Sequence, residues 1–360
     1  LPPPVSTTGP LAWIKTNLFS SPLNTALTVL SLWLLWTIVP PFINWVFLES
    51  IWDAADRKDC WAQMPNPREG ACWAFIIGSF EFFVYGWYPD TEKWRVNLSF
   101  IILIFAIVGV LKEKLPGKKY WLLFAGAFPF IAAWLLLGGF GLKEVETSKI
   151  GGILLTVIIG ITGISFSLPI GIVLALGRRS KMPALSSVCV IFIEFIRGVP
   201  LITLLFVAST MLTYFLPPGS TFDLLMRVLI MVTLFQSAYI AEIVRGGLQG
   251  LSQGQYEAAD SLGLNYWKAH RLIILPQALK ISIPPIVNTF ISLFKDTTLV
   301  LIIGMMDIVG LGRARLNDPY WLGLAGELYL FIAIFFFICC FSMSRYSINL
   351  ENKLSTGRRD

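Results

Sequence analysis

Long apolar runs limit how this chain can fold more than any other feature of its sequence. Eight such runs follow one another, and most of them reach the roughly 20 residues that a helix needs to cross about 30 Å of hydrocarbon. Backbone polar groups inside lipid must be satisfied within the segment, so we expect the runs to be helical. The sequence therefore predicts an all-α integral membrane protein with about eight transmembrane helices, near residues 26–48, 97–111, 120–140, 150–176, 184–215, 224–244, 281–306 and 322–344.

The composition agrees with this prediction. Of the 360 residues, 56% are hydrophobic and only 14% are charged, which lies outside the range of soluble globular domains. The run at 97–111 is short, so it either begins earlier than drawn here or crosses with little tilt. Residues 1–25 are rich in Pro, Ser and Thr and lack the charged start and short apolar core of a cleaved signal peptide. We expect this segment to be a cytoplasmic tail.

Lys and Arg are distributed unevenly between the segments that connect the runs. With the N-terminus inside, the cytoplasmic segments hold 16 of these residues and the outer segments hold nine. Most of the nine lie in one long outer loop, residues 49–96, where charge orients a membrane protein only weakly. The sequence thus predicts that both termini are cytoplasmic, with residues 347–360 as a second tail. The net charge of +6 reports this orientation and needs no nucleic-acid partner.

Residues 71–88 of the outer loop are apolar enough to raise the question of a ninth span. Against this, Glu81 near the centre would cost roughly 3 kcal/mol in lipid. The segment is also rich in Trp, Tyr and Phe, which is typical of a membrane interface. We expect it to lie on the outer surface or to dip into the membrane, because a full crossing would invert the orientation of everything after it.

Cysteine and histidine give no metal-binding pattern. Cys60 and Cys72 both lie in the outer loop, where they either form a disulfide or remain unpaired near the interface. The three remaining cysteines are expected to be buried apolar thiols. His270 is the single histidine, and no zinc-like spacing of Cys and His occurs.

The connection at 245–280 is the longest cytoplasmic one and contains residues that typically start and end helices. Ser252 and Gln255 have the spacing of a capping box, and Gly263 is well placed to end the short helix that follows. A second helix is expected over residues 265–275, where Pro276 prevents simple continuation. This pattern predicts two short helices at an angle.

Side chains on these two helices are suited to docking a partner. Ala258 and Ala259 leave a low surface beside charged Glu257 and Asp260, and Trp267 offers an anchor together with Tyr266 and Leu272. The alternative is an ordinary interhelical loop, but long ordered loops are often functional.

Glu257-Ala258-Ala259 begins a longer spaced pattern. It continues with three residues, Gly263, nine residues, Ile273, one residue and Leu275-Pro276. This spacing resembles the EAA loop of permease subunits of ABC importers. The resemblance implies that the loop fits a groove of a cytoplasmic ATPase, and the residues assigned to that contact are Glu257, Ala258, Ala259, Asp260, Gly263, Trp267, Leu275 and Pro276.

Flanking motifs resemble those of polar amino acid permeases. They read FIRGVPL at 195–201, YIAEIVRGG at 239–247, PQA at 276–278 and KDTTL at 295–299. The resemblance covers about residues 150–350 and implies a five-helix core at 150–346. The extension at 26–149, with three spans, resembles the general L-amino-acid type in CWAF at 72–75 and YGWYP at 85–89.

The resemblance also implies partners and a location. These are a second permease subunit that is a different chain, two ABC ATPase subunits, an extracytoplasmic amino-acid-binding protein and the lipid of a bacterial inner membrane. No G-x-x-x-x-G-K-[ST] loop occurs in the chain, so we expect no catalytic site here. ATP and Mg are expected in the partner ATPase, and this chain is expected to carry no cofactor.

Ionisable side chains inside predicted spans require an explanation because they are costly in lipid. Glu194 and Arg197 lie three apart and can pair along one helix face, whereas adjacent Lys295 and Asp296 point in different directions. These four charges are complementary to a zwitterionic amino acid, or they form salt bridges that fix helix packing. The full set assigned to a substrate path is Glu194, Arg197, Gln236, Asn288, Lys295, Asp296 and Thr297.

Two other function classes compete with an ABC permease. In an ion-coupled secondary amino-acid carrier, the same four charges would serve as a relay. A membrane enzyme is the second alternative, but no nucleophile-base arrangement or metal cluster is found. Pro200 and the pair Pro284-Pro285 are expected to bend their helices. The glycines at 151, 152, 160, 163 and 171 suggest a contact between permease subunits, with internal packing as the alternative.

Overall fold

The computed structural model describes residues 9–66, 69–112, 115–211, 214, 217 and 222–356. These residues fold into helices and connecting segments and contain no β-strand, which confirms the predicted all-α class. The chain divides into two compact units, one formed by Leu1–Gly78 and Leu316–Tyr329 and the other by Ser79–Arg315 and Leu330–Asp360. We describe each unit by itself.

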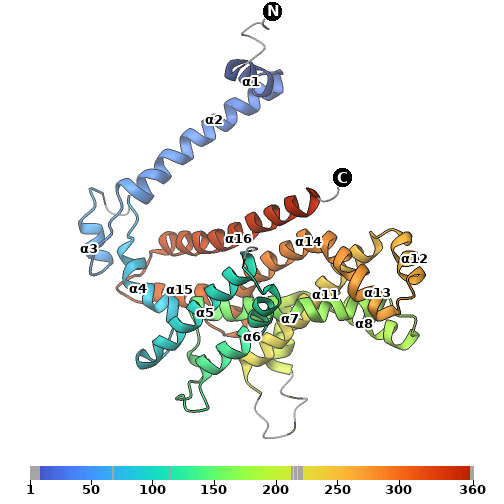
Figure 1. Ribbon diagram of the computed structural model, residues 1–360. Coiled ribbons are helices and arrows are strands. Elements are labelled where there is room, and N and C mark those ends of the chain that lie inside the picture. Colours follow the sequence, from blue (N-terminus) through green and yellow to red (C-terminus); the bar gives the residue numbers. More distant parts are fainter. Residues whose placement is uncertain are drawn as a thin grey trace, which may run out of the picture. The chain divides into compact units, whose positions relative to one another are not determined.

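Figure 1 shows the helices in chain order, coloured along the sequence. Short π-helical or 3-10 turns extend several of them, at Asn44–Leu48, Asp90–Glu92, Thr147–Lys149, Val207–Met211, His270–Ile274 and Thr297–Ile303. The helices are α1 (Pro10–Asn17), α2 (Pro22–Ile43), α3 (Arg57–Ala62), α4 (Ala74–Tyr85), α5 (Lys93–Leu111), α6 (Lys118–Leu137), α7 (Gly152–Arg178), α8 (Pro183–Gly198), α9 (Leu201–Phe206), α11 (Leu224–Gln249), α12 (Gln253–Ser261), α13 (Tyr266–Ala269), α14 (Leu275–Asp296), α15 (Ile308–Leu316) and α16 (Ala325–Thr356).

Among the described residues, seven helices are long and apolar enough to cross a membrane. A bent pair, Pro183–Gly198 and Leu201–Met211, makes an eighth span if its two halves cross together. The predicted run at 184–215 is therefore not one straight helix, because it turns by 104° between the two halves. Pro200 explains the break, since a proline forces the preceding residue out of the helical region, and Val199 is extended.

Helix length answers two questions that the sequence left open, for the segments at 97–111 and 71–88. The span predicted at 97–111 begins earlier, and Asp90–Leu111 covers 22 residues. The apolar segment at 71–88 forms α4, whose 12 residues extend about 18 Å and cannot cross about 30 Å of hydrocarbon. This length agrees with an interfacial or dipping segment and leaves the predicted orientation of the later helices intact.

Helix α7 lies at the centre of the second unit, against α11, α8 and α14. Its glycines permit these contacts. A Cβ at Gly160 would lie 2.9 Å from the Phe294 ring, and one at Gly171 would lie 2.6 Å from Ile240. The predicted use of these glycines between two permease subunits is therefore wrong for these two positions, because side chains of the same chain already fill the space.

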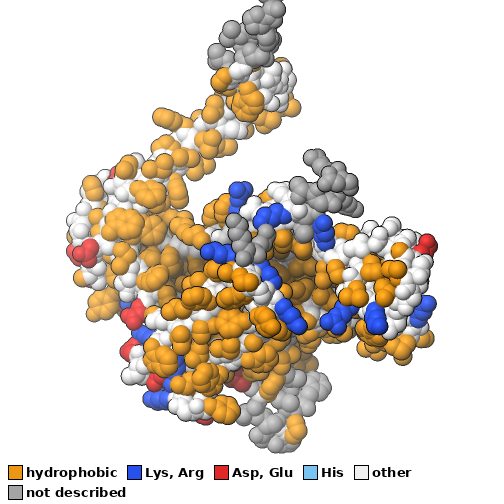
Figure 2. Space-filling model, viewed as in Figure 1, with side chains coloured by type: hydrophobic (Ala, Val, Ile, Leu, Met, Phe, Trp, Pro, Cys, Tyr) orange, Lys and Arg blue, Asp and Glu red, His pale blue; other side chains and the backbone are white. Residues whose placement is uncertain are grey.

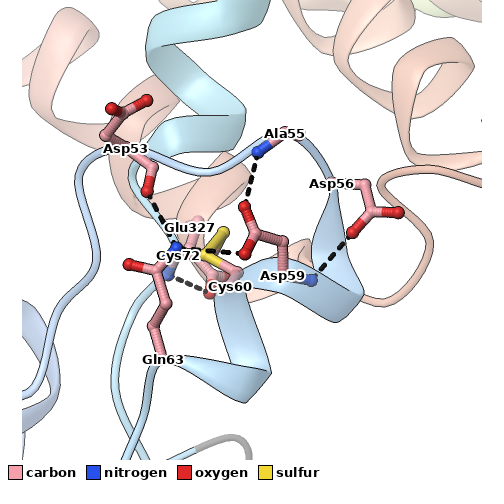
Figure 3. The surroundings of a disulfide bond; sticks show 8 residues. All are labelled: Asp53, Ala55, Asp56, Asp59, Cys60, Gln63, Cys72 and Glu327. Carbon is pink, nitrogen blue, oxygen red and sulfur yellow. Dashed lines mark hydrogen bonds between the residues drawn. A yellow bond between two sulfur atoms is a disulfide. The ribbon is translucent and has the colours of Figure 1, made fainter.

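A disulfide between Cys60 and Cys72 closes part of the outer loop in the first unit (Figure 3). On one side of the bond, the backbone N–H of Cys72 donates to Glu327 Oε1 at 3.0 Å. On the other, α3 is capped by Asp56, whose Oδ1 accepts from Asp59 N at 2.8 Å. The segment is thus held by one covalent bond and by polar contacts at both ends.

Removal of the disulfide should loosen this unit measurably. The bond spans a sequence separation of 12 residues, and closure of a loop of about this length stabilises a protein by about 3 kcal/mol. We expect Cys60→Ser or reduction with dithiothreitol to lower the unfolding temperature of the outer segment. Limited proteolysis at increasing temperature measures this unfolding. Cys339→Ser serves as the control, and identical proteolysis of the wild type with and without reductant would contradict the prediction.

Asp307 is a buried carboxylate in the connection before α15, and sequence reasoning did not single it out. Its side chain has no exposed surface, Oδ1 accepts from Gly310 N at 2.9 Å, and Oδ2 has no partner among the described residues. Burial raises the pKa of this carboxyl to about 6. The neighbouring Met306 carbonyl accepts from Gly152 N at 2.9 Å, so this connection also holds the start of α7.

The raised pKa predicts a pH-dependent contribution to stability. The folded protein holds the Asp307 proton more tightly than the unfolded chain, in which the pKa is near 3.8. The stabilisation is therefore complete below about pH 4 and is lost as the pH rises through about 6. Between these limits we expect the wild type to lose on the order of 2 kcal/mol relative to Asp307→Asn, which keeps the Oδ1 acceptor. Parallel pH profiles of the two unfolding temperatures would refute this.

Candidate functional site: a coupling surface and an ion-pair cluster

The segment predicted to dock a partner begins with α12. Ser252 occupies the position before the helix, but its side chain makes no capping bond. The predicted capping box is wrong because Gln255 is used elsewhere, accepting from Gln277 Nε2 at 2.8 Å and so tying α12 to α14. Gly263 ends the helix as predicted, with a φ of +66° and the Leu264 N–H bonded to the Ala259 carbonyl.

The second predicted helix does not end at Pro276. Instead α13 continues through a π-helical turn at His270–Ile274 into α14. Pro276 lacks the N–H that a regular helix would use, and the π turn, in which Leu275 N donates to the His270 carbonyl, absorbs this missing donor. The docking segment thus consists of the short helix α12 followed by α13, which continues into the membrane span α14.

Exposed residues between positions 257 and 272 form what we call the coupling surface: Glu257, Ala258, Asp260, Leu262, Gly263, Tyr266, Trp267 and Leu272. Leu262 is 72% exposed and Trp267 is 71% exposed. Figure 2 shows hydrophobic side chains on the surface over α12 and α13. Large apolar side chains with this exposure are typical of an interaction site.

Three residues assigned to the ATPase contact lie partly or wholly off this surface. Ala259 is 1% exposed, so it packs inward and cannot leave a low surface for a partner. Leu275 is half-buried, and Pro276 is exposed at the start of α14. Only Ala258 of the alanine pair faces outward.

A polar contact joins α12 to the end of α7. Arg179 Nη1 donates to the Tyr256 hydroxyl at 3.1 Å, and that hydroxyl donates to the Leu248 carbonyl at 3.2 Å. The Arg179 guanidinium also lies 5.6 Å from the centre of the Tyr256 ring. Helix α12 is therefore attached to both α7 and α11.

Five charged side chains next to this contact form what we call the ion-pair cluster: Arg178, Glu194, Arg197, Glu242 and Arg245. Arg178 Nη1 lies 2.8 Å from Glu194 Oε1 and 3.3 Å from Glu242 Oε2. Glu242 also accepts from Arg245 Nε at 2.9 Å, and its Oε2 lies 3.9 Å from Arg197 Nη1. The cluster joins α7, α8 and α11.

The predicted pairing of Glu194 with Arg197 is wrong. Glu194 pairs with Arg178 across two helices, and Arg197 turns to Glu242 and to the Tyr239 ring, 5.6 Å from its guanidinium. Arg178, Glu242 and Arg245 were missed by sequence reasoning. One signal was available, because Glu242 falls inside the predicted run 224–244 and meets the same cost in lipid as the charges that were noted.

Lys295 and Asp296 lie at the far end of α14 and belong to no ion pair of the described residues. The register of α11 against α14 is antiparallel, with Gln236 Nε2 donating to the Thr289 carbonyl at 2.8 Å. At about 1.5 Å per residue, Asp296 then lies about 20 Å from the level of Glu242. The four predicted charges therefore cannot all contact one amino acid.

The remaining residues assigned to the path have different surroundings. Gln236 and Thr297 are buried, and the Thr297 hydroxyl donates to the Phe294 carbonyl at 2.8 Å. Asn288 is exposed on α14. The described residues contain no group of three His, Cys, Asp or Glu that is able to hold a metal ion.

Comparison with known proteins assigns this arrangement to a class. Residues 167–356 match the family described as "Binding-protein-dependent transport system inner membrane component", which covers more than half of the chain and includes the coupling surface and the ion-pair cluster. The chain belongs to this family.

Two relatives extend the match to the N-terminal part. The inner membrane amino-acid ABC transporter permease protein YhdY of Escherichia coli (strain K12) is 50% identical over 97% of this chain and 94% of its own length. The glutamate/glutamine/aspartate/asparagine transport system permease protein BztC of Rhodobacter capsulatus is 43% identical, over 99% of this chain and 96% of its own length. The predicted permease class is confirmed, and the ion-coupled carrier gains no support.

A solved structure supports the helical core. The structure titled "Crystal structure of an amino acid ABC transporter with histidines" is 29% identical to this chain, with a TM-score of 0.50. The match covers 56% of this chain and 92% of that one.

Proposed function

We propose that this permease moves amino acids into the cell and couples their passage to ATP hydrolysis in a partner through the coupling surface. The observation that carries the proposal is the exposure of Leu262 and Trp267 next to a helix that ends at left-handed Gly263. The substrate class rests on the names of the relatives, which are amino-acid transporters.

The contacts behind the coupling surface provide a route for motion. A displacement of α12 pulls on the Tyr256–Arg179 contact, and adjacent Arg178 belongs to the ion-pair cluster. The cluster connects three spans, so it can shift them together. Coupling of this kind is a difference in ATPase affinity between two permease states, and it requires rigid contacts.

Lys295 and Asp296 are the better candidates for direct contact with substrate. Each lacks a protein ion-pair partner among the described residues, and together they complement the carboxylate and ammonium of an amino acid. Thr297 follows them in the chain. Arg197, in contrast, already has Glu242 as a partner and is assigned to packing.

The assembly that we propose contains a second, different permease, two ATPase subunits that bind ATP and Mg, and an extracytoplasmic binding protein. Both termini face the cytoplasm of the inner membrane. Residues 26–149 form the extension, and 150–346 form the core around the cytoplasmic loop 245–280. The excess of Lys and Arg in the inner segments supports this orientation, as does a count of eight spans, which is reached if the bent pair of α8 and α9 crosses as one span.

Proteoliposomes test the proposal. With the partner subunits and ATP inside, we expect uptake of a labelled amino acid, and without ATPase subunits we expect none. Uptake driven by an ion gradient alone would establish the carrier instead. Binding to the isolated permease separates the path residues, because Asp296→Ala should weaken binding at least about tenfold whereas Arg197→Ala should change it little.

A further inference from the structure

A small pocket lies in the first unit, partly within the segment that the Cys60–Cys72 disulfide closes. Its volume is about 330 Å³, near the lower end of the range of roughly 300–1,000 Å³ for small-molecule sites. The lining residues that carry the argument are Trp45, Arg57, Trp61, Gly323, Gly326 and Glu327. None of them belongs to the coupling surface, the ion-pair cluster or the Lys295–Asp296 pair.

Two opposite charges line this pocket without pairing. Arg57 and Glu327 form no ion pair with each other or with any other of the described residues. A charge removed from water is costly unless a partner compensates it. A ligand that carries both a negative and a positive group is able to compensate both residues at once.

The Arg57 guanidinium is held in place but is not saturated. Its Nη1 donates to the Leu322 carbonyl at 2.7 Å, and the group lies 5.0 Å from the centre of the Trp61 ring. Its Nε is buried and has no hydrogen-bond partner among the described residues. Because a buried Nε is closed to a ligand, a carboxylate in the pocket is bound by the Nη donors of this planar fork.

Glu327 is the acidic residue of the pocket lining. The residue is 5% exposed, and its Oε1 accepts from the backbone N–H of Cys72 at 3.0 Å (Figure 3). This bond fixes the carboxylate but supplies no positive charge. An ammonium group is the complement that the site lacks.

Indole rings and glycines form the remaining wall of the pocket. A Cβ at Gly326 would lie 3.1 Å from the Trp45 ring, and one at Gly323 would lie 4.0 Å from Arg57 Nη1. Glycine at position 326 lets the Trp45 ring pack closely against the backbone, and glycine at position 323 leaves room beside the guanidinium. Two indole rings add apolar surface for the rest of a small ligand.

We propose that this pocket binds a free α-amino acid as its zwitterion, with the carboxylate on Arg57 and the ammonium on Glu327. The disulfide nearby is typical of an oxidising compartment, so the site faces the side from which an importer takes its substrate. The proposal goes beyond the transport function, because binding here requires neither ATP nor the coupling surface.

Equilibrium binding of radiolabelled L-glutamine to the purified full-length chain in lipid nanodiscs tests this. The Asp296→Ala background removes the candidate path site. We expect saturable binding that Arg57→Gln and Glu327→Gln each weaken at least about tenfold, the loss of one good charged contact. Lys58→Gln is the matched control, because it removes an exposed charge from the same helix outside the pocket.

The ligand chemistry gives a second readout. The methyl ester of glutamine lacks the carboxylate and N-acetylglutamine lacks the ammonium, so neither should compete with the labelled amino acid. The side-chain amide introduced by Glu327→Gln keeps an acceptor for Cys72 N–H, and an intact disulfide measured by mass spectrometry verifies the fold. Unchanged affinity in both pocket variants, or no saturable binding of any of the common amino acids in the Asp296→Ala background, would overturn the proposal. A failure of ATP-driven uptake with binding retained would count against the transport function alone.

Discussion

A Gly263→Arg permease should reach the membrane and fold but lose ATP-driven uptake by about 100-fold, which corresponds to a coupling free energy in the upper part of the usual range of about 1–3 kcal/mol. Gly263 has a φ of +66°, which L side chains rarely adopt. A Cβ there meets no atom within 4 Å, so the core is not disturbed. The change instead strains the turn that ends α12 and places a long cation on the coupling surface.

Gly254→Ala is the matched control for this experiment. Gly254 lies in the first turn of the same helix, has open space around its Cβ position and has no positive φ. Alanine favours a helix relative to glycine by about 1 kcal/mol, so we expect uptake within about twofold of the wild type. Uptake and stimulated ATPase activity are measured in proteoliposomes with equal amounts of permease. Normal uptake by the Gly263→Arg protein would falsify the coupling role.

The helices that cross the membrane were predictable because a single physical requirement defines them. Lipid demands about 20 apolar residues with internally bonded backbone, and this requirement leaves a strong signal in the sequence. The bend near Pro200 was predictable from the proline itself, whereas the apolar run at 97–111 left open whether α5 begins earlier or crosses with little tilt. Local backbone chemistry, as at Gly263, was equally readable, since only glycine occupies that conformation without strain.

Side-chain partners were much harder to predict. The spacing of Glu194 and Arg197 allows a pair along one helix. In the structure, Glu194 pairs instead with Arg178 of α7, and Arg197 pairs with Glu242 of α11. Gln255 fits a capping box, yet a glutamine of α14 is its partner. In each case a local pattern competes with a contact between helices, and the packing of the helices decides the outcome.

Pro276 shows a third kind of limit. A proline normally ends a helix, and the expectation of two separate short helices depended on that rule. The chain instead uses the π turn at His270–Ile274, a backbone form without a distinctive sequence signal. As a result α13 is continuous with the membrane span α14, whereas α12 remains a separate helix that ends at the Gly263 turn.

Replacement of Glu242 by glutamine should be the most damaging single change within the ion-pair cluster. Its carboxylate serves Arg178, Arg197 and Arg245, and its side chain is 23% exposed. Loss of one partner of a buried pair costs about 3–5 kcal/mol, and partial exposure reduces this to about 2 kcal/mol here. We expect a lower unfolding temperature and uptake reduced at least about tenfold per folded complex.

Glu194→Gln is the control, because that side chain is 54% exposed and, among the described residues, forms an ion pair only with Arg178. Its removal should cost about 0.5 kcal/mol or less. The double variant Glu242→Gln/Arg178→Gln removes one uncompensated cation, so its stability should recover in part even though each single change is harmful. If the cluster only fixes packing, uptake per folded complex will recover together with stability. If the cluster transmits the motion of α12, stability will recover and uptake will not, because Arg178 is the neighbour of the Arg179 that holds Tyr256.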